Sequence, residues 1–352
     1  MIEILKLDKE SDREAYTAIL KTLNLKDPYN SLEFINSFSD GFSNLVCLKV
    51  TQDSHIVLLP GYSNEIEGTE KKDFLSPYGY SGLIYCPSTP GGIVDAAWIE
   101  IKEYLDQHFV STFIRFSLDT DYSFFKEGVK PIMKNIRGVI IDYDTQWSNF
   151  ENKVRKNVRR AKRENLRAEI IDGSDLSIKQ LRVFYDIYVD TMKRNNAEDK
   201  YYFSFEQFSS FSSSRGELCA FCFIYDENKV VSVEMVLKSE DSIFSFLGGT
   251  LSEAFSKRPN DFLKYELINW ARNEGLKYFV LGGGYGAEDG IYNYKKSFFP
   301  NDVVDYCVGK FIHNENDYKT LSEKAKENFI ANNDKSEEDF YCLNFFPLYR
   351  AT

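Results

Sequence analysis

The sequence predicts an α/β protein with two domains, each built on a mixed, mostly antiparallel sheet flanked by helices. Three observations support this fold class. The chain has 352 residues, enough for two domains of ordinary size. Its hydrophobic content of 43% and aromatic content of 16% are sufficient for real cores. Short apolar segments joined by turn residues alternate with segments of helical periodicity in both halves of the chain. We place the domain boundary after residue 145.

The N-terminal domain, residues 1–145, is predicted from clear local signals. Ser11 and Asp12 can cap a helix whose apolar residues recur at helical spacing. The turn formers at 51–54 separate two apolar segments, which predicts a hairpin. The loop with Tyr78 and Tyr80 either lines a ligand site or is only a compact structural loop. The other expected elements are an edge strand within 1–10, helices over 32–38 and 93–108, and strands over 113–116 and 138–143.

The C-terminal domain, residues 146–352, begins with the most basic segment of the chain. Residues 147–166 predict one long helix, and Val154 and Val158 mark its buried side. Its basic residues crowd together on a protein whose net charge is −11. They either bind the phosphate groups of a ligand or form a solvated face, and we favour phosphate binding. The candidate ligand-binding residues of this helix are Arg155, Arg159 and Arg160.

A three-stranded meander is predicted in the middle of this domain, with a hairpin turn at residues 226–228. Glu234 lies in its second strand among apolar neighbours. This carboxylate is either a desolvated base with a raised pKa or a group that faces solvent. The expected elements are strands over 168–171, 218–225, 230–238, 243–247, 277–281 and 303–311, helices over 177–194 and 318–331 and one opening at 259, and a serine-rich loop over 209–216.

The segment from Leu281 to Lys295 is the strongest candidate for a reactive site. A short apolar strand runs into Gly282, Gly283 and Gly284. Three glycines permit positive φ angles and the close approach of a ligand or of another backbone. A glycine-walled cleft with a lysine at its rim suits a reaction in which negative charge develops on an oxygen. The alternative is a tight turn followed by a solvated pair of lysines.

The composition argues against several other classes of function. A net charge of −11 is not that of a general nucleic-acid binder. The three histidines, His55, His108 and His313, lie in no local motif, so we expect neither a histidine-based nucleophile nor a catalytic metal. Cys219 and Cys222 fall on opposite faces of a predicted strand, which favours buried thiols over metal ligands. Without a leader or a membrane-spanning segment in this sequence, we expect a soluble cytoplasmic protein.

Several motifs follow one another in an order that is typical of a known family. A meander is followed by a helix, a strand, a helix and a last strand. The motifs are Arg155 to Arg163, Tyr188-x-x-Thr-Met-x-Arg194 with Tyr201-Tyr-Phe203, Gly248-Gly-Thr250, and Leu281 to Gly284 continued by Asp289-Gly and Tyr294-Lys-Lys-Ser-Phe298, with Ser76-Pro-Tyr-Gly-Tyr80 in the first domain. Together they resemble the Fem-type branch of the GNAT acyltransferase superfamily, which includes peptidoglycan bridge aminoacyltransferases and GNAT-like proteins of cell-surface polysaccharide clusters. The resemblance covers nearly the whole chain.

The resemblance implies two tandem GNAT-like domains that transfer an acyl or aminoacyl group to a primary amine. The acceptor amine is expected on an amino sugar or a precursor peptide of the bacterial cell envelope. By position, Lys295 matches the family lysine near the reacting carbonyl, and either Glu234 or Asp289 is the candidate base. The other residues expected to contact donor or acceptor are Gly282, Gly283, Gly284, Tyr285, Thr250, Arg155, Arg159, Arg160, Arg194, Tyr201, Tyr78 and Tyr80.

The donor stays open among an acyl-CoA, an acyl carrier protein and an aminoacyl-tRNA. GNAT enzymes hold the coenzyme A pyrophosphate on a glycine-rich turn at a helix N-terminus. The matching turn here, Lys257 to Asp261, has no glycine, although Arg258 and the helix amides can still bind phosphate. The helical arm of several bridge enzymes has no counterpart either, which weakens the case for tRNA. A GNAT-like module that only binds a nucleotide sugar or a partner is the alternative function, and the oligomeric state stays open.

Overall fold

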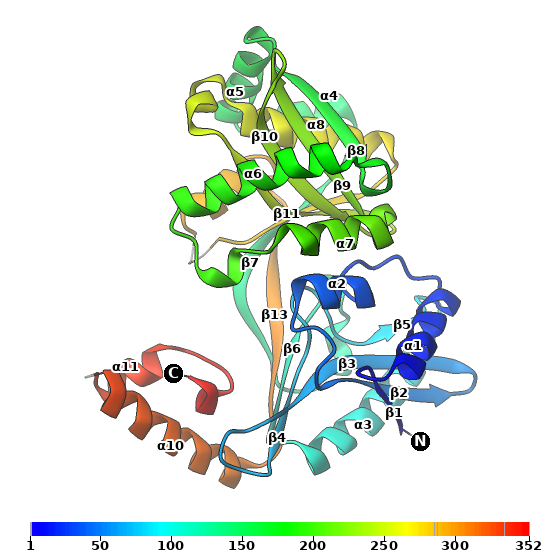
Figure 1. The fold of residues 1–352 in the computed structure, drawn as a ribbon. Coiled ribbons are helices and arrows are strands. Elements are labelled where there is room, and N and C mark those ends of the chain that lie inside the picture. The colour runs from blue at the N-terminus through cyan, green and yellow to red at the C-terminus, as the bar shows by residue number, and fades with distance from the viewer. Residues whose placement is uncertain (1, 285, 287, 334, 352) are drawn as a thin grey trace. The chain divides into compact units, whose positions relative to one another are not determined.

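The chain forms two compact units in the computed structural model, which describes residues 2–284, 286, 288–333 and 335–351 (Figure 1). Unit 1 contains Met1–Leu25, Ser39–Ile132 and Tyr306–Thr352. Unit 2 contains Lys26–Phe38 and Met133–Asp305. Each unit is described separately below.

The boundary of the units differs from the single boundary predicted after residue 145. The chain passes from unit 1 to unit 2 within strand β7 (Val129–Val139) and returns within strand β13 (Val303–Ile312). The segment Lys26–Phe38 also belongs to unit 2, because its aromatic side chains pack there. The ring centroid of Phe38 lies 5.5 Å from that of Phe208. Packing between distant segments of the chain therefore determines the boundaries of the units. The local pattern of the sequence does not reveal this packing.

Unit 1 contains a mixed sheet in the order β1-β2-β3-β4-β6-β13. Strands β4 and β6 are parallel, and the other neighbours along this order are antiparallel. Helix α3 lies between the two parallel strands in sequence, and its buried residues join the core of this unit. The elements are β1 (Ile2–Lys6), α1 (Glu10–Thr22), β2 (Leu45–Gln52), β3 (His55–Glu65), β4 (Lys72–Leu75), β5 (Ile84–Tyr85), α3 (Gly91–His108), β6 (Ser111–Arg115), α10 (Glu315–Asn333) and α11 (Glu337–Cys342).

Unit 2 contains a mixed sheet in the order β7-β12-β11-β10-β9-β8. Strands β11 and β12 are parallel, and the other neighbours are antiparallel. Helix α8 connects the parallel pair, as α3 does in unit 1. The elements are α2 (Leu32–Phe38), α4 (Tyr143–Asn149), α5 (Asn152–Arg163), β8 (Arg167–Asp172), α6 (Ile178–Arg194), α7 (Phe205–Arg215), β9 (Cys219–Asp226), β10 (Lys229–Lys238), β11 (Ser242–Thr250), α8 (Pro259–Asn273), β12 (Tyr278–Gly282) and α9 (Gly290–Lys296).

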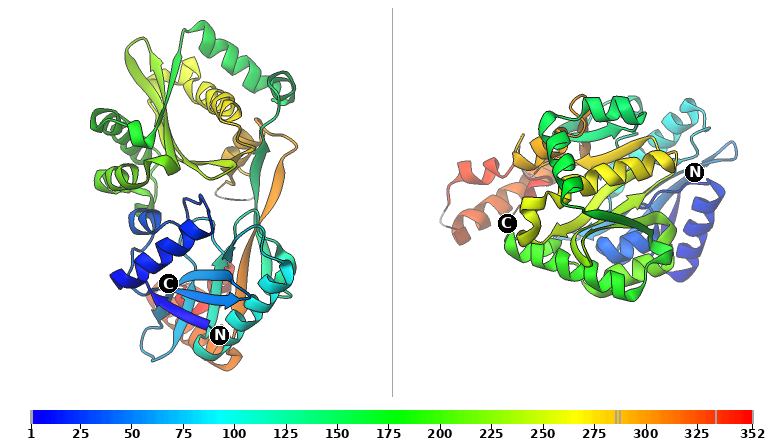
Figure 2. Two further views of the ribbon diagram at one scale, coloured as in Figure 1. Left: turned by 90° about the vertical axis from the view of Figure 1, so that its right-hand side faces the viewer. Right: turned by 90° about the horizontal axis from the view of Figure 1, so that it is seen from above.

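Helices cover both faces of the sheet of unit 2. Helices α6 and α7 lie on one face, and α5 and α8 lie on the other (Figure 2). The core on the α8 side includes Val158 of α5, Leu267 of α8 and Phe279 of β12. Cys219 and Cys222 are buried free thiols in β9, as predicted. The predicted class, an α/β protein with mostly antiparallel mixed sheets and flanking helices, is therefore confirmed.

The predicted helix over 147–166 is wrong in one respect, because two helices occupy this region. Helix α4 ends at Asn149, and α5 begins at Asn152. Phe150 adopts an extended conformation between them and is buried in the core, with 2% of its surface exposed. Arg155 donates a hydrogen bond to the carbonyl oxygen of Ser148 at 2.8 Å and another to that of Phe150. These bonds satisfy carbonyl groups that a helix end leaves without intrahelical partners.

Two further predictions of local structure are corrected. The expected strand over 138–143 lies earlier in the chain, because β7 ends at Val139. The serine-rich segment 209–216 is not a loop, because helix α7 continues to Arg215. Ser212 and Ser213 donate hydrogen bonds to the carbonyl oxygens four residues before them, each at 2.7 Å. Serine hydroxyl groups that would otherwise compete with the helix are satisfied within it.

Several local signals were predicted correctly, but the expected cap of the first helix was not, because α1 begins at Glu10, before Ser11 and Asp12. Helix α6 begins with a capping box in which Ser177 and Gln180 satisfy each other's backbone amides. Helix α8 begins at Pro259, a residue suited to the first helical position. Strand β1 lies at the edge of its sheet, as expected. Among the described residues, no helix combines the length and the apolar character required to cross a bilayer.

Candidate functional site

A cavity of about 530 Å³ opens in unit 2, beside β10, β11 and the start of α8. Its lining combines small residues of β11 with several charged side chains. Four of the lining side chains are basic and two are acidic, although the protein as a whole carries an excess of acidic residues. The lining residues used below are Thr191, Arg194, Glu234, Ser245, Gly248, Gly249, Thr250, Arg258, Asn260, Asp261, Lys264, Tyr294 and Lys295.

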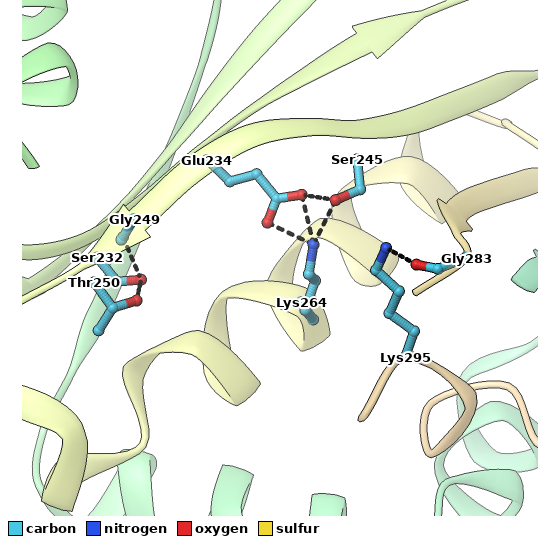
Figure 3. A network of polar contacts seen from close by, with 8 residues as sticks. All are labelled: Ser232, Glu234, Ser245, Gly249, Thr250, Lys264, Gly283 and Lys295. Carbon is cyan, nitrogen blue, oxygen red and sulfur yellow. Dashed lines mark hydrogen bonds and ion pairs between the residues drawn. The ribbon is translucent and has the colours of Figure 1, made fainter. Parts of the chain in front are cut away.

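Glycine at position 249 allows α6 to lie close to β11 at this cavity. A Cβ atom on Gly249 would meet the side chain of Thr191 and would lie 2.6 Å from the carbonyl oxygen of Ile187. Since a backbone atom cannot move aside as a side chain can, only glycine fits this position. The amide of Thr250 donates a hydrogen bond to Thr191 Oγ1 at 3.2 Å. The hydroxyl groups of Ser232 and Thr250 are 2.7 Å apart (Figure 3). The predicted residue Thr250 thus lines the cavity.

Glu234 does not face solvent, because Lys264 of α8 binds it inside the protein. The Nζ atom of Lys264 lies 2.5 and 2.6 Å from the two carboxylate oxygens of Glu234 (Figure 3). It also lies 2.9 Å from Ser245 Oγ, and Ser245 donates a hydrogen bond of 2.7 Å to Glu234. Only 5% of Glu234 and 6% of Lys264 are exposed. The candidate base is therefore the carboxylate of a closed, buried ion pair.

Lys264 and Ser245 were not predicted as residues of the site. Lys264 lies between Leu263 and Tyr265, on a helix whose buried residues are otherwise largely apolar. The signal that was available is a lysine at a core-facing position of a helix, together with a glutamate in the middle of a buried strand. Since buried charges are normally paired, a buried lysine and a buried glutamate in one domain are expected to bind each other.

Lys295 of α9 reaches the same cavity. Its Nζ atom donates a hydrogen bond to the carbonyl oxygen of Gly283 at 2.6 Å (Figure 3). Burial and then the charge of Lys264 lower the pKa of Lys295 to about 8, against the opposing effects of Glu234 and Asp289. An ammonium group has three donors, so two remain for a ligand. The structure therefore places the predicted lysine at the cavity.

None of Gly282, Gly283 and Gly284 is among the described residues that line the cavity, and Gly283 instead accepts the hydrogen bond of Lys295. Gly282 has a φ angle of +75°. A Cβ atom on Gly284 would collide with the carboxylate of Asp289. The direct ligand contact expected for these glycines stays a prediction. Tyr285 lies outside the described residues.

Asp289 caps the helix that carries Lys295. Its Oδ1 atom accepts a hydrogen bond from the amide of Tyr292 at 2.7 Å, and its Oδ2 atom accepts one from the amide of Gly286 at 3.2 Å. An aspartate at this position stabilises the first turn of a helix. Asp289 does not line the cavity, whereas Glu234 does. Its evident role is to orient α9, and a role as the base stays untested.

The start of α8 presents a second polar region to the cavity. Arg258 precedes this helix with φ and ψ angles of 63° and 42°. Asp261 in the first turn is 9% exposed and accepts a hydrogen bond from Asn157 at 3.0 Å. Burial raises the pKa of Asp261. Asn260 lies near the hydroxyl group of Tyr294, but this buried hydroxyl makes no hydrogen bond of ordinary geometry within the described residues. Such an atom is suited to a polar group of a ligand.

The binding of phosphate by the basic helix stays a prediction. Arg155, Arg159 and Arg160 are not among the described residues that line it. Arg155 binds the end of α4, the guanidinium of Arg159 lies 5.5 Å from the ring centroid of Trp147, and Arg160 pairs with Glu164 at 3.8 Å. Arg194 does line the cavity, where its guanidinium donates hydrogen bonds to Asp190 at 3.0 Å and to Thr191 at 3.3 Å.

We expect Arg155→Ala to act on stability. The change leaves carbonyl groups at the end of α4 without their charged donor, so the free energy of unfolding should fall by about 1–3 kcal/mol. Urea denaturation of the purified protein measures this change. Lys156→Ala is the matched control, since this neighbouring side chain is exposed, and it should change the free energy by less than about 0.5 kcal/mol. Equal stabilities of the two variants would contradict the capping role.

The predicted tyrosines lie apart from the described lining of this cavity. The carbonyl oxygen of Tyr201 accepts a hydrogen bond from the hydroxyl group of Tyr188, which ties the segment after α6 to that helix. Tyr78 and Tyr80 belong to unit 1. There Tyr80 stacks edge-to-face on Tyr306 with ring centroids 5.6 Å apart, and 45% of Tyr78 is exposed. Their contact with an acceptor stays a prediction.

The segment of the chain that contains this cavity matches a known protein family. Residues 149–296 match the family model described as an acetyltransferase (GNAT) domain. Every described residue that lines the cavity falls inside this range. A search of curated protein sequences returns no match.

Solved structures with the same fold cover most of the chain. The crystal structure of FemX is 12% identical, with a TM-score of 0.63, over 88% of this chain and 98% of FemX. The structure of L-PGS from Bacillus licheniformis is 15% identical, with a TM-score of 0.57, over 89% and 95% of the two chains. The C-terminal domain of a putative lysylphosphatidylglycerol synthetase from Agrobacterium fabrum is 12% identical, with a TM-score of 0.54, over 87% and 92%. Residues 149–296 therefore match a GNAT acetyltransferase domain, and the chain has the fold of FemX, which confirms the GNAT-like relationship predicted from the sequence.

Proposed function

We propose that this protein is an N-acyltransferase of bacterial cell-envelope biosynthesis that moves an aminoacyl group from a carrier oxygen to a primary amine. The acceptor we propose is the amine of an amino sugar or of a precursor peptide. The observation that carries the proposal is the buried ammonium group of Lys295, held by Gly283 at the cavity of the GNAT segment.

The cavity contains the groups that such a transfer requires. The acceptor nitrogen attacks the acyl carbon, a C–N bond forms, and the electron pair of the C=O bond moves to oxygen. The ammonium group of Lys295 neutralises that charge with a donor not used by Gly283. The C=O bond then forms again, the bond to the carrier oxygen breaks, and the proton of the amine ends on the carrier oxygen.

The start of α8 favours a donor other than acetyl-CoA. Helix N-termini bind the pyrophosphate of a coenzyme through free amides and a glycine-rich turn. Here Pro259 supplies no amide proton, Arg258 replaces a glycine, and the buried carboxyl group of Asp261 occupies the first turn. A carboxyl group at this position disfavours a second, doubly charged anion. An aminoacyl ester of tRNA does not require a pyrophosphate there.

The neighbours also support an aminoacyl group. Two of the structures with this fold are named L-PGS and lysylphosphatidylglycerol synthetase, and the second name describes a product that contains lysine. The basic side chains of α5 remain available for a polyanionic carrier, because Arg159 and Arg160 are exposed on its surface.

A transfer assay tests the proposal. Radiolabelled aminoacyl-tRNA and radiolabelled acetyl-CoA are supplied separately to the purified full-length protein, together with amino-sugar and peptide amines. We expect labelled amide from the tRNA donor, loss of that product after ribonuclease treatment, and no amide from acetyl-CoA. Lys295→Met in the same preparation controls for contaminating enzymes.

Each other outcome contradicts a stated part of the proposal. Amide formed only from acetyl-CoA would exclude the aminoacyl donor, especially if coenzyme A raised the melting temperature of the protein and Arg258→Ala removed that rise. If neither donor gave an amide with natively folded protein, the transferase proposal would be wrong. Tight binding of a nucleotide sugar in that case would favour a binding module.

A further inference from the structure

The ion pair between Glu234 and Lys264 is unusual in its burial. Both side chains are 7% exposed, and in every other ion pair between described residues at least one partner is exposed to a larger extent. All three protons of the Lys264 ammonium have acceptors, namely the two carboxylate oxygens and Ser245 Oγ (Figure 3). Lys264 therefore has no proton left with which to bind a substrate.

Burial of such a pair is difficult to explain by stability alone. The free energy needed to remove two charges from water is roughly equal to the free energy gained from their attraction. A protein with apolar residues of similar volume in place of such a pair is often as stable. The core around α8 is otherwise apolar, with Leu263, Leu267 and Phe279 fully buried. A charged pair retained within this core, at the wall of the reactive cavity, points to a role in the cavity.

The group on which this pair acts is Lys295, because Glu234, Lys264 and Lys295 line the same cavity and the ammonium group of Lys295 lies beside that of Lys264 (Figure 3). The charged groups that influence Lys295 come from three elements, namely Lys264 on α8, Glu234 on β10 and Asp289 at the start of α9. Burial has the largest effect on the pKa of Lys295, and Lys264 has the next largest, and both lower it. Glu234 and Asp289 raise it. Because Lys264 is fixed by three hydrogen bonds, its charge acts from a constant position.

We propose that Lys264 is a positioning residue whose charge, fixed by Glu234 and Ser245, prepares Lys295 to exchange a proton during acyl transfer. This inference rests on the proposed function and adds a proton transfer to it. When the tetrahedral intermediate collapses, the bond between the acyl carbon and the carrier oxygen breaks. Lys295 gives a proton to that oxygen and takes one from the new amide nitrogen. Lysine is restored, and no further reactant is needed.

A lysine with an ordinary pKa is poorly suited to this step. General acids and bases act best when their pKa lies near the operating pH. The pKa of Lys295, about 8 in place of 10.5, meets this condition. The same lysine still carries a positive charge at neutral pH, so it can also support the oxyanion.

Competitive labelling of the full-length protein tests the inference without a substrate. A trace of isotopically labelled acetic anhydride reacts with neutral amines between pH 6.5 and 11, and mass spectrometry follows the peptide that contains Lys295. The exposed Lys156 is the internal reference. We expect a labelling midpoint near pH 8 for Lys295 in the native protein.

The variants have opposite expected effects. In Lys264→Met the midpoint of Lys295 should rise by roughly one pH unit, because a repelling charge is lost and Glu234 is left unpaired. In Glu234→Gln it should fall by a similar amount, because Lys264 is left unneutralised. Lys264→Arg keeps the charge and should restore the native midpoint. A merely structural role would admit water in both charge-removing variants and raise the midpoint in both.

Shifts in the same direction, or no shift, would overturn the inference. If either single variant failed to fold, the double variant Glu234→Gln with Lys264→Met leaves no unpaired ion. Its midpoint should still rise, since Lys264 affects Lys295 more than Glu234 does, and an unchanged midpoint would equally overturn the inference. These measurements need no turnover. A result that contradicts this inference can therefore be distinguished from a result that contradicts the proposed function.

The proton transfer itself has a separate readout in the transfer assay. Lys264→Met should reduce turnover of the natural aminoacyl ester about tenfold or more at pH 7, since general acid catalysis contributes at least that much. A nitrophenyl ester of the same amino acid has a leaving oxygen that needs no proton, and its turnover should change far less. Equal losses with both esters would exclude proton donation by Lys295.

Discussion

Lys295→Met is expected to lower kcat/KM for acyl transfer by about 10²–10³-fold, because the oxyanion of the intermediate loses its only cationic donor in the proposed mechanism. Donor and acceptor affinity should change little, since the interaction forms in the transition state. Steady-state kinetics with the donor that passes the transfer assay measure the effect. Lys296→Met is the matched control, because Lys296 is the next residue of α9, outside the described lining of the cavity, and should keep native kinetics.

The pH dependence gives a second check on the same residue. The pKa of Lys295 is lowered to about 8, so the group is charged below that pH and becomes neutral above it. We therefore expect kcat/KM to fall as the pH rises through about 8, and Lys295→Arg to move that decline to higher pH. Full turnover in Lys295→Met, or an unchanged alkaline decline in Lys295→Arg, would show that the central residue is wrongly assigned.

The second large effect is expected on stability, from breaking the buried ion pair. Lys264→Met leaves the carboxylate of Glu234 buried without its cation, and the free energy of unfolding should fall by about 3–5 kcal/mol. Glu234→Gln should have an effect of similar size. The double variant should lose much less than the sum of the two, because no unpaired charge remains in the core. Urea denaturation of the four proteins closes this double-mutant cycle.

An exposed ion pair provides the comparison. Lys229 and Glu253 pair with side chains that are 61% and 66% exposed, so Lys229→Met should change the free energy of unfolding by less than about 1 kcal/mol. Additive effects of Lys264→Met and Glu234→Gln, each as small as that of Lys229→Met, would mean that the two side chains do not interact as described.

The local elements of the site could be read from sequence because their signals are short in range. A strand ending at three glycines and the lysine that follows them both lie between residues 277 and 296, whereas the capping of α9 by Asp289 was not predicted. Neighbouring residues impose such features through φ angles and hydrogen bonds of the adjacent backbone. The predicted starts of α6, after its cap Ser177, and of α8, at Pro259, are likewise confirmed.

The basic segment shows where this reasoning fails. The sequence pattern of residues 147–166 is typical of a helix, but it does not show that Phe150 is buried in the core. Once Phe150 packs into the core, the helix is interrupted, and Arg155 turns back to bind the end of α4. A side chain that was predicted to bind phosphate thus has an identified structural task. Composition indicates that a charge is present, whereas packing decides which partner it has.

We could derive from the sequence the α/β class, most helix and strand positions, the glycine-to-lysine segment and the resemblance to GNAT-like acyltransferases. These depend on periodicity, turn residues and motif spacing, which act over a few residues. The folded structure was needed to establish that Lys264 binds Glu234, 30 residues earlier in the chain, and that segments 26–38 and 306–352 join units that are distant in sequence. Such pairings depend on which faces of the sheet the helices cover, because burial leaves each charged group only the partners that packing brings within reach.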